Sequence, residues 1–180
     1  MKHFLIVLSL FAIPVSANAQ DHRHGAAPRT ADLSDVRSLS GADVAELRRG
    51  GGWGLARPAE LNGVPGPAHL LELKDEIPLS EAQAARAAEL VETMRHHAIQ
   101  LGEELIALEV ELEQGFRGGS MTPVRLKNLL DEIAVTRARL RFVHLSAHLE
   151  TVKFLTKQQI RRYAVLRGYT DPTDEAVGMN

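Results

Sequence analysis

Histidines at helical spacing are the residues of this chain best suited to chemistry. His144 and His148 lie four residues apart in a segment with helical periodicity, so both imidazoles would project from one helix face and could share a divalent ion. In an antiparallel helix pair with its turn near Gly119, positions whose numbers sum to about 240 lie level with each other. The candidate ligands for zinc, copper or nickel are therefore His97, His144, His148 and Met94 or Glu92. Such histidine pairs also occur at exposed or packed positions without a metal.

A second candidate metal site lies near the N-terminus. Cleavage after Ala19 would leave Gln20-Asp21-His22 as the first residues of the mature chain. The free amine, two backbone amides and the imidazole of His22 can bind Cu(II) or Ni(II) in a square plane. Cyclisation of Gln20, or cleavage one residue away, would remove this site.

Residues 1–19 predict export. Met1-Lys2-His3 is followed by an apolar run and by Ala17-Asn18-Ala19, which is the pattern of a signal peptide cleaved after Ala19. The apolar run is shorter than the roughly 20 residues that span a bilayer, so we expect no stable membrane anchor. The chain has no cysteine, which excludes a lipid-modified N-terminal cysteine and disulfides. We expect a periplasmic protein.

Composition favours a single helical domain. Only 4% of the residues are aromatic, while alanine, leucine, glutamate and arginine are abundant, which is typical of helices joined by thin apolar seams. The formal net charge of −2 argues against nucleic acid as a partner.

The N-terminal part of the mature chain is polar and rich in glycine and proline. Residues 20–38 lack periodicity and are predicted to be a disordered leader. Residues 39–64 are predicted to form a short helix with Ser40 as N-cap, followed by an irregular lead-in. Residues 171–180 are predicted to be a flexible tail. The residues able to pin the lead-in to a helical body are Trp53, Leu55 and Leu61.

Residues 65–170 are predicted to form a helical domain. Ser80 and Gln83 form a capping-box pattern at the start of a long helix that ends at Gly118-Gly119. Thr122-Pro123 begins a second long helix. Apolar residues at spacings of three and four line one face of each, namely Val91, Met94, Ala98, Leu101, Leu105, Leu108 and Leu112, then Leu126, Leu130, Ile133, Leu140, Val143 and Ala147.

Two shorter helices are expected beside this pair. Pro67 suits the first position of a helix to about Glu76. Thr156 and Gln159 repeat the capping box and begin a last helix that ends near Arg167. The predicted fold is all-α, a long antiparallel helical hairpin with short flanking helices.

Charge is divided unevenly between the two long helices. Acidic residues dominate 79–118 and basic residues dominate 122–168. One interpretation is two solvated faces that attract each other across the hairpin. The other is a mixed basic and apolar surface that receives a flexible partner, with Arg137, Arg139 and Arg141 as its candidate client-binding residues.

Two short motifs carry a family resemblance. Leu79-Ser80-Glu81-Ala82-Gln83 and Leu155-Thr156-Lys157-Gln158-Gln159 resemble the LTxxQ motif of a family of periplasmic helical proteins. This family includes the Spy and CpxP chaperone-like stress proteins and the metal-linked proteins ZraP and CnrX. The resemblance implies a helical hairpin that dimerises into a cradle-shaped body, and it implies histidine, carboxylate and methionine ligands where a metal is bound. By themselves the motifs also serve as capping boxes.

No motif of an enzyme is present. The sequence has no phosphate-binding glycine loop, nucleophile elbow or His-Glu-x-x-His pattern. We therefore expect a non-enzymatic, Spy- or CpxP-like periplasmic protein that binds unfolded or stress-exposed polypeptides and requires no cofactor. The alternatives are a ZraP- or CnrX-like metal-binding or metal-sensing protein and a purely structural module.

Overall fold

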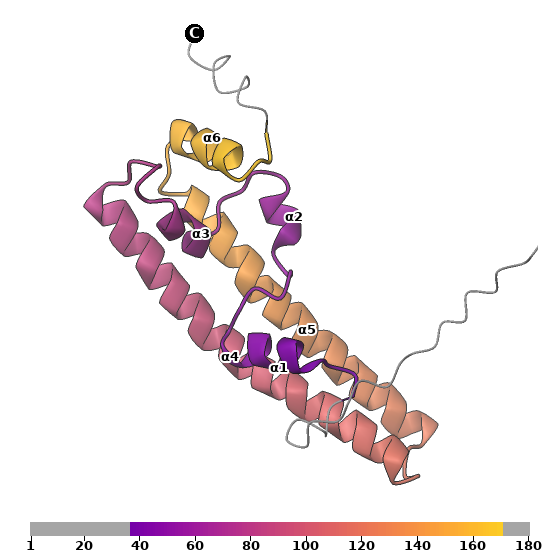
Figure 1. Cartoon of the computed structure of the whole chain (residues 1–180). Helices are drawn as coiled ribbons and strands as arrows, with labels where there is room; N and C mark the ends of the chain where they lie inside the picture. Colours follow the sequence, from indigo (N-terminus) through magenta and orange to yellow (C-terminus); the bar gives the residue numbers. More distant parts are fainter. Residues whose placement is uncertain (1–36, 171–180) are drawn as a thin grey trace, which may run out of the picture. The chain divides into compact units, whose positions relative to one another are not determined.

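The computed structural model describes residues 37–170, and every regular element in this range is a helix (Figure 1). The predicted all-α fold is thereby confirmed. The predicted signal peptide, His22, the leader up to residue 36 and the tail at 171–180 lie outside the described residues. Within residues 37–170, no helix is both long enough and apolar enough to cross a membrane.

Two long helices form the body of the described part. They are α4 (Glu81–Arg117) and α5 (Pro123–Val152), which pack side by side and antiparallel (Figure 1). Each begins at the residue that the sequence predicts. The Ser80 hydroxyl accepts a hydrogen bond from the backbone of Gln83, and the Thr122 hydroxyl accepts one from the third residue of α5. These side chains satisfy amide groups that the first turn of a helix leaves unpaired.

The turn between the two helices sets their register. Gly119 has a φ of +64°, a region in which a side chain would be strained. Across the pair, Thr136 Oγ1 donates a hydrogen bond of 2.7 Å to Glu104 Oε1, and Thr136 is 1% exposed. This is the pairing that a turn near Gly119 predicts.

Three short helices and their loops lie along one side of the α4–α5 pair, drawn in indigo and purple in Figure 1. Helix α1 rests on α4 at Gly102, where a built Cβ would lie 2.6 Å from the Leu47 carbonyl oxygen. Leu47 belongs to the same apolar core as Leu105 and Leu140. The absence of a side chain at Gly102 therefore allows α1 to approach α4 closely. The three helices are α1 (Gly41–Arg48), α2 (Arg57–Glu60) and α3 (Pro67–Glu72).

The last helix, α6 (Lys157–Leu166), joins the start of α4 through two glutamines. Gln83 Nε2 donates to the Phe154 carbonyl and Gln159 Nε2 donates to the Pro78 carbonyl, each at 2.8 Å. The two side-chain amides also bond to each other at 2.9 and 3.0 Å. Each glutamine closes its own capping box as well. The two motifs therefore form one reciprocal junction, in addition to marking two helix starts.

The connection from α3 to α4 differs from the prediction. Helix α3 ends at Glu72 rather than near Glu76, because residues after it turn and bury Ile77 completely in a second apolar core with Tyr163. The lead-in, predicted to be irregular, contains the single-turn helix α2, which Pro58 helps to begin.

Two leucines predicted to be packed are exposed. Leu130 is 47% exposed and Leu129 is 4% exposed, because the buried face of α5 passes through Leu129 and Ile133. Leu61 is 57% exposed, whereas Gly63, two residues later, is buried. Trp53 and Leu55 do pack against the core, as the sequence predicts.

Candidate functional site

The two histidines predicted to share one helix face are both buried. His144 is 2% exposed and His148 is 5% exposed. His148 Nδ1 lies 2.9 Å from the Val64 carbonyl oxygen, which can only accept, so this nitrogen donates. A Cβ on Gly66 would lie 2.7 Å from the His148 ring, so the lead-in packs directly on it. Burial lowers the pKa of both histidines, which favours the neutral rings.

The predicted metal ligands are divided between different surroundings. His97 is exposed and lines a groove with Met94 and Glu150, whereas His144 and His148 are buried. Within the described range, no three histidine, cysteine or acidic side chains are grouped closely enough to hold a metal ion. The structure thus brings Met94 and His97 together, but not His97 with the buried pair. Metal binding at these positions stays a prediction.

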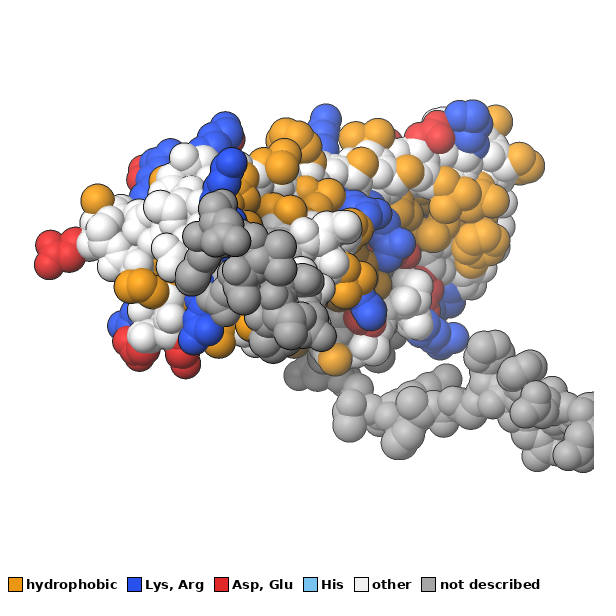
Figure 2. Space-filling view, turned by 90° about the horizontal axis from the view of Figure 1, so that it is seen from above, with side chains coloured by type: hydrophobic (Ala, Val, Ile, Leu, Met, Phe, Trp, Pro, Cys, Tyr) orange, Lys and Arg blue, Asp and Glu red, His pale blue; other side chains and the backbone are white. Residues whose placement is uncertain are grey.

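One row of apolar side chains on α5 is open to solvent. Val135 is 48% exposed, Phe142 is 71% exposed and Leu149 is 60% exposed. Their spacing of seven residues places them on the same side of the helix. Figure 2 shows hydrophobic side chains gathered in patches on the face that it presents, with Lys and Arg side chains beside them. We call the row Val135, Phe142 and Leu149 the open apolar row.

Two shallow grooves between α4 and α5 flank Phe142. The first has a volume of about 510 Å³ and is lined by Leu101, Val135 and Arg139 among others. The second has a volume of about 250 Å³ and contains Met94 and His97. Phe142 borders both grooves, so a ligand that follows the open apolar row must contact it.

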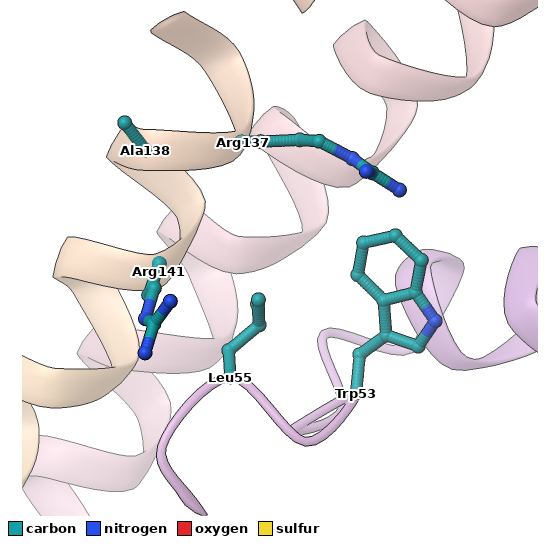
Figure 3. Close-up of a pocket in the computed structure, with 5 residues that line it drawn as sticks. All are labelled: Trp53, Leu55, Arg137, Ala138 and Arg141. Atoms are coloured by element: carbon teal, nitrogen blue, oxygen red, sulfur yellow. The ribbon is translucent and has the colours of Figure 1, made fainter. Parts of the chain in front are cut away.

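The three predicted client-binding arginines do not share one surface. Arg139 lines the first groove, whereas Arg137 and Arg141 line a separate cavity with Trp53 and Leu55 (Figure 3). Residues two apart on a helix point to opposite sides, and residues four apart point to the same side. Among residues 37–170, none of the three arginines forms an ion pair. An ion pair between the two long helices is formed instead by Arg125 of α5 and Glu111 of α4, at 3.1 Å.

The cavity beside Trp53 has a volume of about 480 Å³. Trp53 has a φ of +43° and is the single non-glycine residue with positive φ in the described range, which is an unfavourable conformation for a bulky residue. Its indole Nε1 donates to Asp43 Oδ1 at 2.8 Å, and the Arg137 guanidinium carbon lies 5.0 Å from its ring centroid. Hydrogen bonds, first from Ser40 and then from Trp53, lower the pKa of Asp43, so this carboxylate stays ionised.

Sequence reasoning missed this cavity. It identified Trp53 as a packing residue and grouped Arg137 with Arg139 and Arg141 in one surface. The helical spacing of the arginines carried a usable signal, because it separates Arg139 from the other two. The approach of the lead-in to α5 carries no such signal, since it joins residues far apart in the chain.

No known family model, no curated protein and no solved structure matches this chain.

Proposed function

We propose that this is an exported, non-enzymatic protein of the periplasm that holds unfolded polypeptide segments, like the chaperone-like members of the LTxxQ family. The observation that carries the proposal is the open apolar row on α5, with Phe142 71% exposed between two grooves. The export signal and the two LTxxQ-like motifs support the same proposal. Large apolar side chains left in water along one side of a helix are typical of an interaction surface.

The dimensions of the open apolar row suit an extended segment. Val135 and Leu149 are separated by about 21 Å along the helix at 1.5 Å per residue. An extended chain of roughly six residues covers this length. Burial of one large side chain such as Phe142 contributes about 1.5–3 kcal/mol before the entropic cost of ordering a flexible partner. The expected binding is therefore weak and reversible, as holding and release require.

Arg139 gives the row a polar edge. It lines the same groove as Val135 and Phe142 and has no ion pair within residues 37–170. Its guanidinium donors can bond the carbonyl groups of an extended partner, and these groups are present whatever the partner's sequence. This combination suits many unfolded chains rather than one.

Suppression of aggregation tests the proposal. Insulin aggregates when dithiothreitol reduces its disulfides, and this protein has no cysteine for the reductant to act on. We expect the mature protein to suppress the resulting light scattering without ATP. Phe142→Ser should remove most of this effect, because Phe142 borders both grooves. Phe116→Ser is the matched control, since Phe116 is 59% exposed and lines neither groove.

Three results would contradict the proposal. The first is that the mature protein does not suppress the light scattering. The second is that the two serine variants are equally impaired. In the third, Phe142→Ser would turn a dimer into a monomer in sedimentation and leave suppression intact, so that the row would be covered by a second copy. The dimer that the family resemblance implies stays a prediction.

Metal binding is the second candidate function. The observation that favours it is that Met94, His97 and Glu150 line one groove, which supplies thioether, imidazole and carboxylate donors together. Glu150 Oε1 also bonds Lys153 Nζ at 2.6 Å, so a metal would have to compete for this carboxylate. We rank this function below polypeptide binding for that reason.

A further inference from the structure

The cavity beside Trp53 combines an aromatic wall with two positive charges. Trp53 and Leu55 come from the lead-in, and Arg137 and Arg141 come from successive turns of α5, which also contributes Ala138 to the lining (Figure 3). The cavity volume of about 480 Å³ lies within the range of small binding pockets.

The Trp53 ring is fixed before any ligand arrives. Its indole donates a hydrogen bond to Asp43. The Asp43 carboxylate also accepts hydrogen bonds from the Ser40 hydroxyl at 2.6 Å and the Ser40 backbone amide at 2.9 Å. The positive φ of Trp53 is a strain that the surrounding contacts must offset. Such residues are frequent at binding sites, and a fixed ring loses little entropy when a ligand stacks on it.

The two arginines of the cavity are outside the salt bridges formed among residues 37–170. Neither Arg137 nor Arg141 forms an ion pair with a residue in the described range, and like charges four residues apart on a helix repel each other. The charge of Arg137 makes only the smallest contribution to the lowered pKa of Asp43. The hydrogen bonds of Asp43 to Ser40 and Trp53 occupy this carboxylate. An anion in the cavity would relieve the repulsion between the arginines.

We propose that this cavity binds an acidic side chain of a bound polypeptide together with the apolar or aromatic residue next to it. The carboxylate would accept hydrogen bonds from Arg137 and Arg141, and the neighbouring side chain would lie against Trp53 and Leu55. A guanidinium pairs well with a carboxylate because its donors match both oxygens. The occupant is a peptide segment because the cavity adjoins the groove of the open apolar row.

Ala138 provides that continuity. It lines both the Trp53 cavity and the groove that contains Val135, Arg139 and Phe142. A segment lying along the open apolar row can therefore extend past Ala138 into the cavity. This inference rests on the proposed polypeptide binding, and it adds a preference for segments in which an acidic residue lies next to an apolar one.

Two peptides that differ only in a carboxylate or a carboxamide group test the preference for an acidic residue. Both are acetylated, amidated, leucine-containing dodecapeptides without tryptophan, one with a central Phe-Asp and the other with Phe-Asn. Calorimetry measures the affinity, and the fluorescence of Trp53, the single tryptophan of the chain, reports where the peptide binds. We expect the Phe-Asp peptide to bind about tenfold more tightly, as one charge-assisted contact supplies, and to change the Trp53 emission.

Arginine variants connect the preference to the cavity. Arg141→Gln should bring the Phe-Asp peptide to the affinity of the Phe-Asn peptide. Arg139→Gln is the matched control and should leave the ratio of the two affinities unchanged, because Arg139 lies in the groove and not in the cavity. All three arginines are exposed, so both variants should melt at the temperature of the parent protein.

The outcomes separate this inference from the proposed function. If neither peptide binds, polypeptide binding itself fails. If both bind equally and Arg141→Gln changes neither, polypeptide binding stands and the acidic preference is wrong. If phenylpropionate alone binds as tightly as the Phe-Asp peptide and in the same Arg141-dependent way, the cavity takes small carboxylates and the peptide assignment is overturned.

Discussion

Replacing Gly102 by alanine should displace helix α1 from α4, whereas the same change at Gly115 should not. Both glycines are buried, Gly102 in the interior of α4 and Gly115 in its last turn. At Gly102 a Cβ would lie 2.6 Å from the Leu47 carbonyl oxygen and 3.1 Å from its carbon, which are backbone atoms. At Gly115 the nearest atom would be Met121 Cε, the end of a flexible side chain. The two sites thus differ in what must move.

The size of the effect follows from two opposing contributions. Replacing glycine by alanine stabilises a helix interior by about 1 kcal/mol, and this gain applies in full at Gly102 and in smaller part at Gly115, in the last turn of α4. The contact at Gly102 falls about 0.4 Å short of the 3.0 Å that real Cβ atoms keep, and overpacking of this kind costs about 1–3 kcal/mol. Gly115→Ala should therefore be neutral or stabilising by up to about 1 kcal/mol, and Gly102→Ala should be about 1–3 kcal/mol less stable than Gly115→Ala.

Urea unfolding followed by far-UV circular dichroism measures this difference. A second readout is Trp53 fluorescence, because Asp43 of α1 holds the Trp53 indole. Gly102→Ala should shift the emission of the folded protein, and Gly115→Ala should leave it unchanged. Equal free energies of unfolding and equal emission for the two variants would show that α1 does not rest on Gly102, and the account of the Trp53 cavity would lose its support.

Two further predictions concern the histidines. Burial lowers the pKa of His144 and His148 below 6.5. The free energy of unfolding should therefore be highest above this pH and should decrease as the pH falls below it, because the unfolded chain takes up protons that the folded chain does not. Each histidine contributes a slope of at most about 1.4 kcal/mol per pH unit. Urea unfolding at several pH values checks this, and a stability that is constant through pH 6.5 would contradict the burial argument. For metal binding, calorimetric titration with zinc, copper and nickel should show weaker binding in His97→Ala and no change in the double variant at His144 and His148. Loss of binding in the double variant instead would place the metal at the buried pair, and loss only after removal of residues 20–24 would place it at His22.

Local signals in the sequence predicted the helix starts well. Ser80, Thr122 and Thr156 each cap the helix that follows them. Ser80 and Thr156 were expected to do so because a glutamine lies three positions later, and Thr122 because a proline follows it. The glycine turn at Gly119 likewise predicted the hairpin and its register. These features depend on residues a few positions apart, so the sequence contains all the information that they need.

The covering of α5 by the lead-in could not be predicted. His144 and His148 were correctly placed on one helix face, but nothing in their spacing indicates that Val64 and Gly66 bury that face. The lead-in is irregular and rich in glycine and proline, so it has no periodicity from which a buried side can be derived. Its path is decided by tertiary contacts such as the fit of His148 against Gly66.

The lack of a local signal for tertiary contacts also explains why the predicted metal ligands lie in two different surroundings. The level pairing of α4 and α5 was right, since Met94 and His97 line a groove with Val143 and Ala147. The position along the hairpin, however, does not specify the side of the helix. His97 lies in that groove, whereas His144 is buried.

Site-specific photo-crosslinking tests directly whether an unfolded polypeptide contacts the open apolar row. A photoreactive phenylalanine analogue is placed at Phe142 in one sample and at Phe116 in another, and each is irradiated with reduced insulin B chain. We expect a crosslink to the B chain from position 142 and little or none from position 116. Equal crosslinking from both positions, or a crosslink from position 142 only to a second copy of this protein, would contradict the claim that the open apolar row holds unfolded polypeptides.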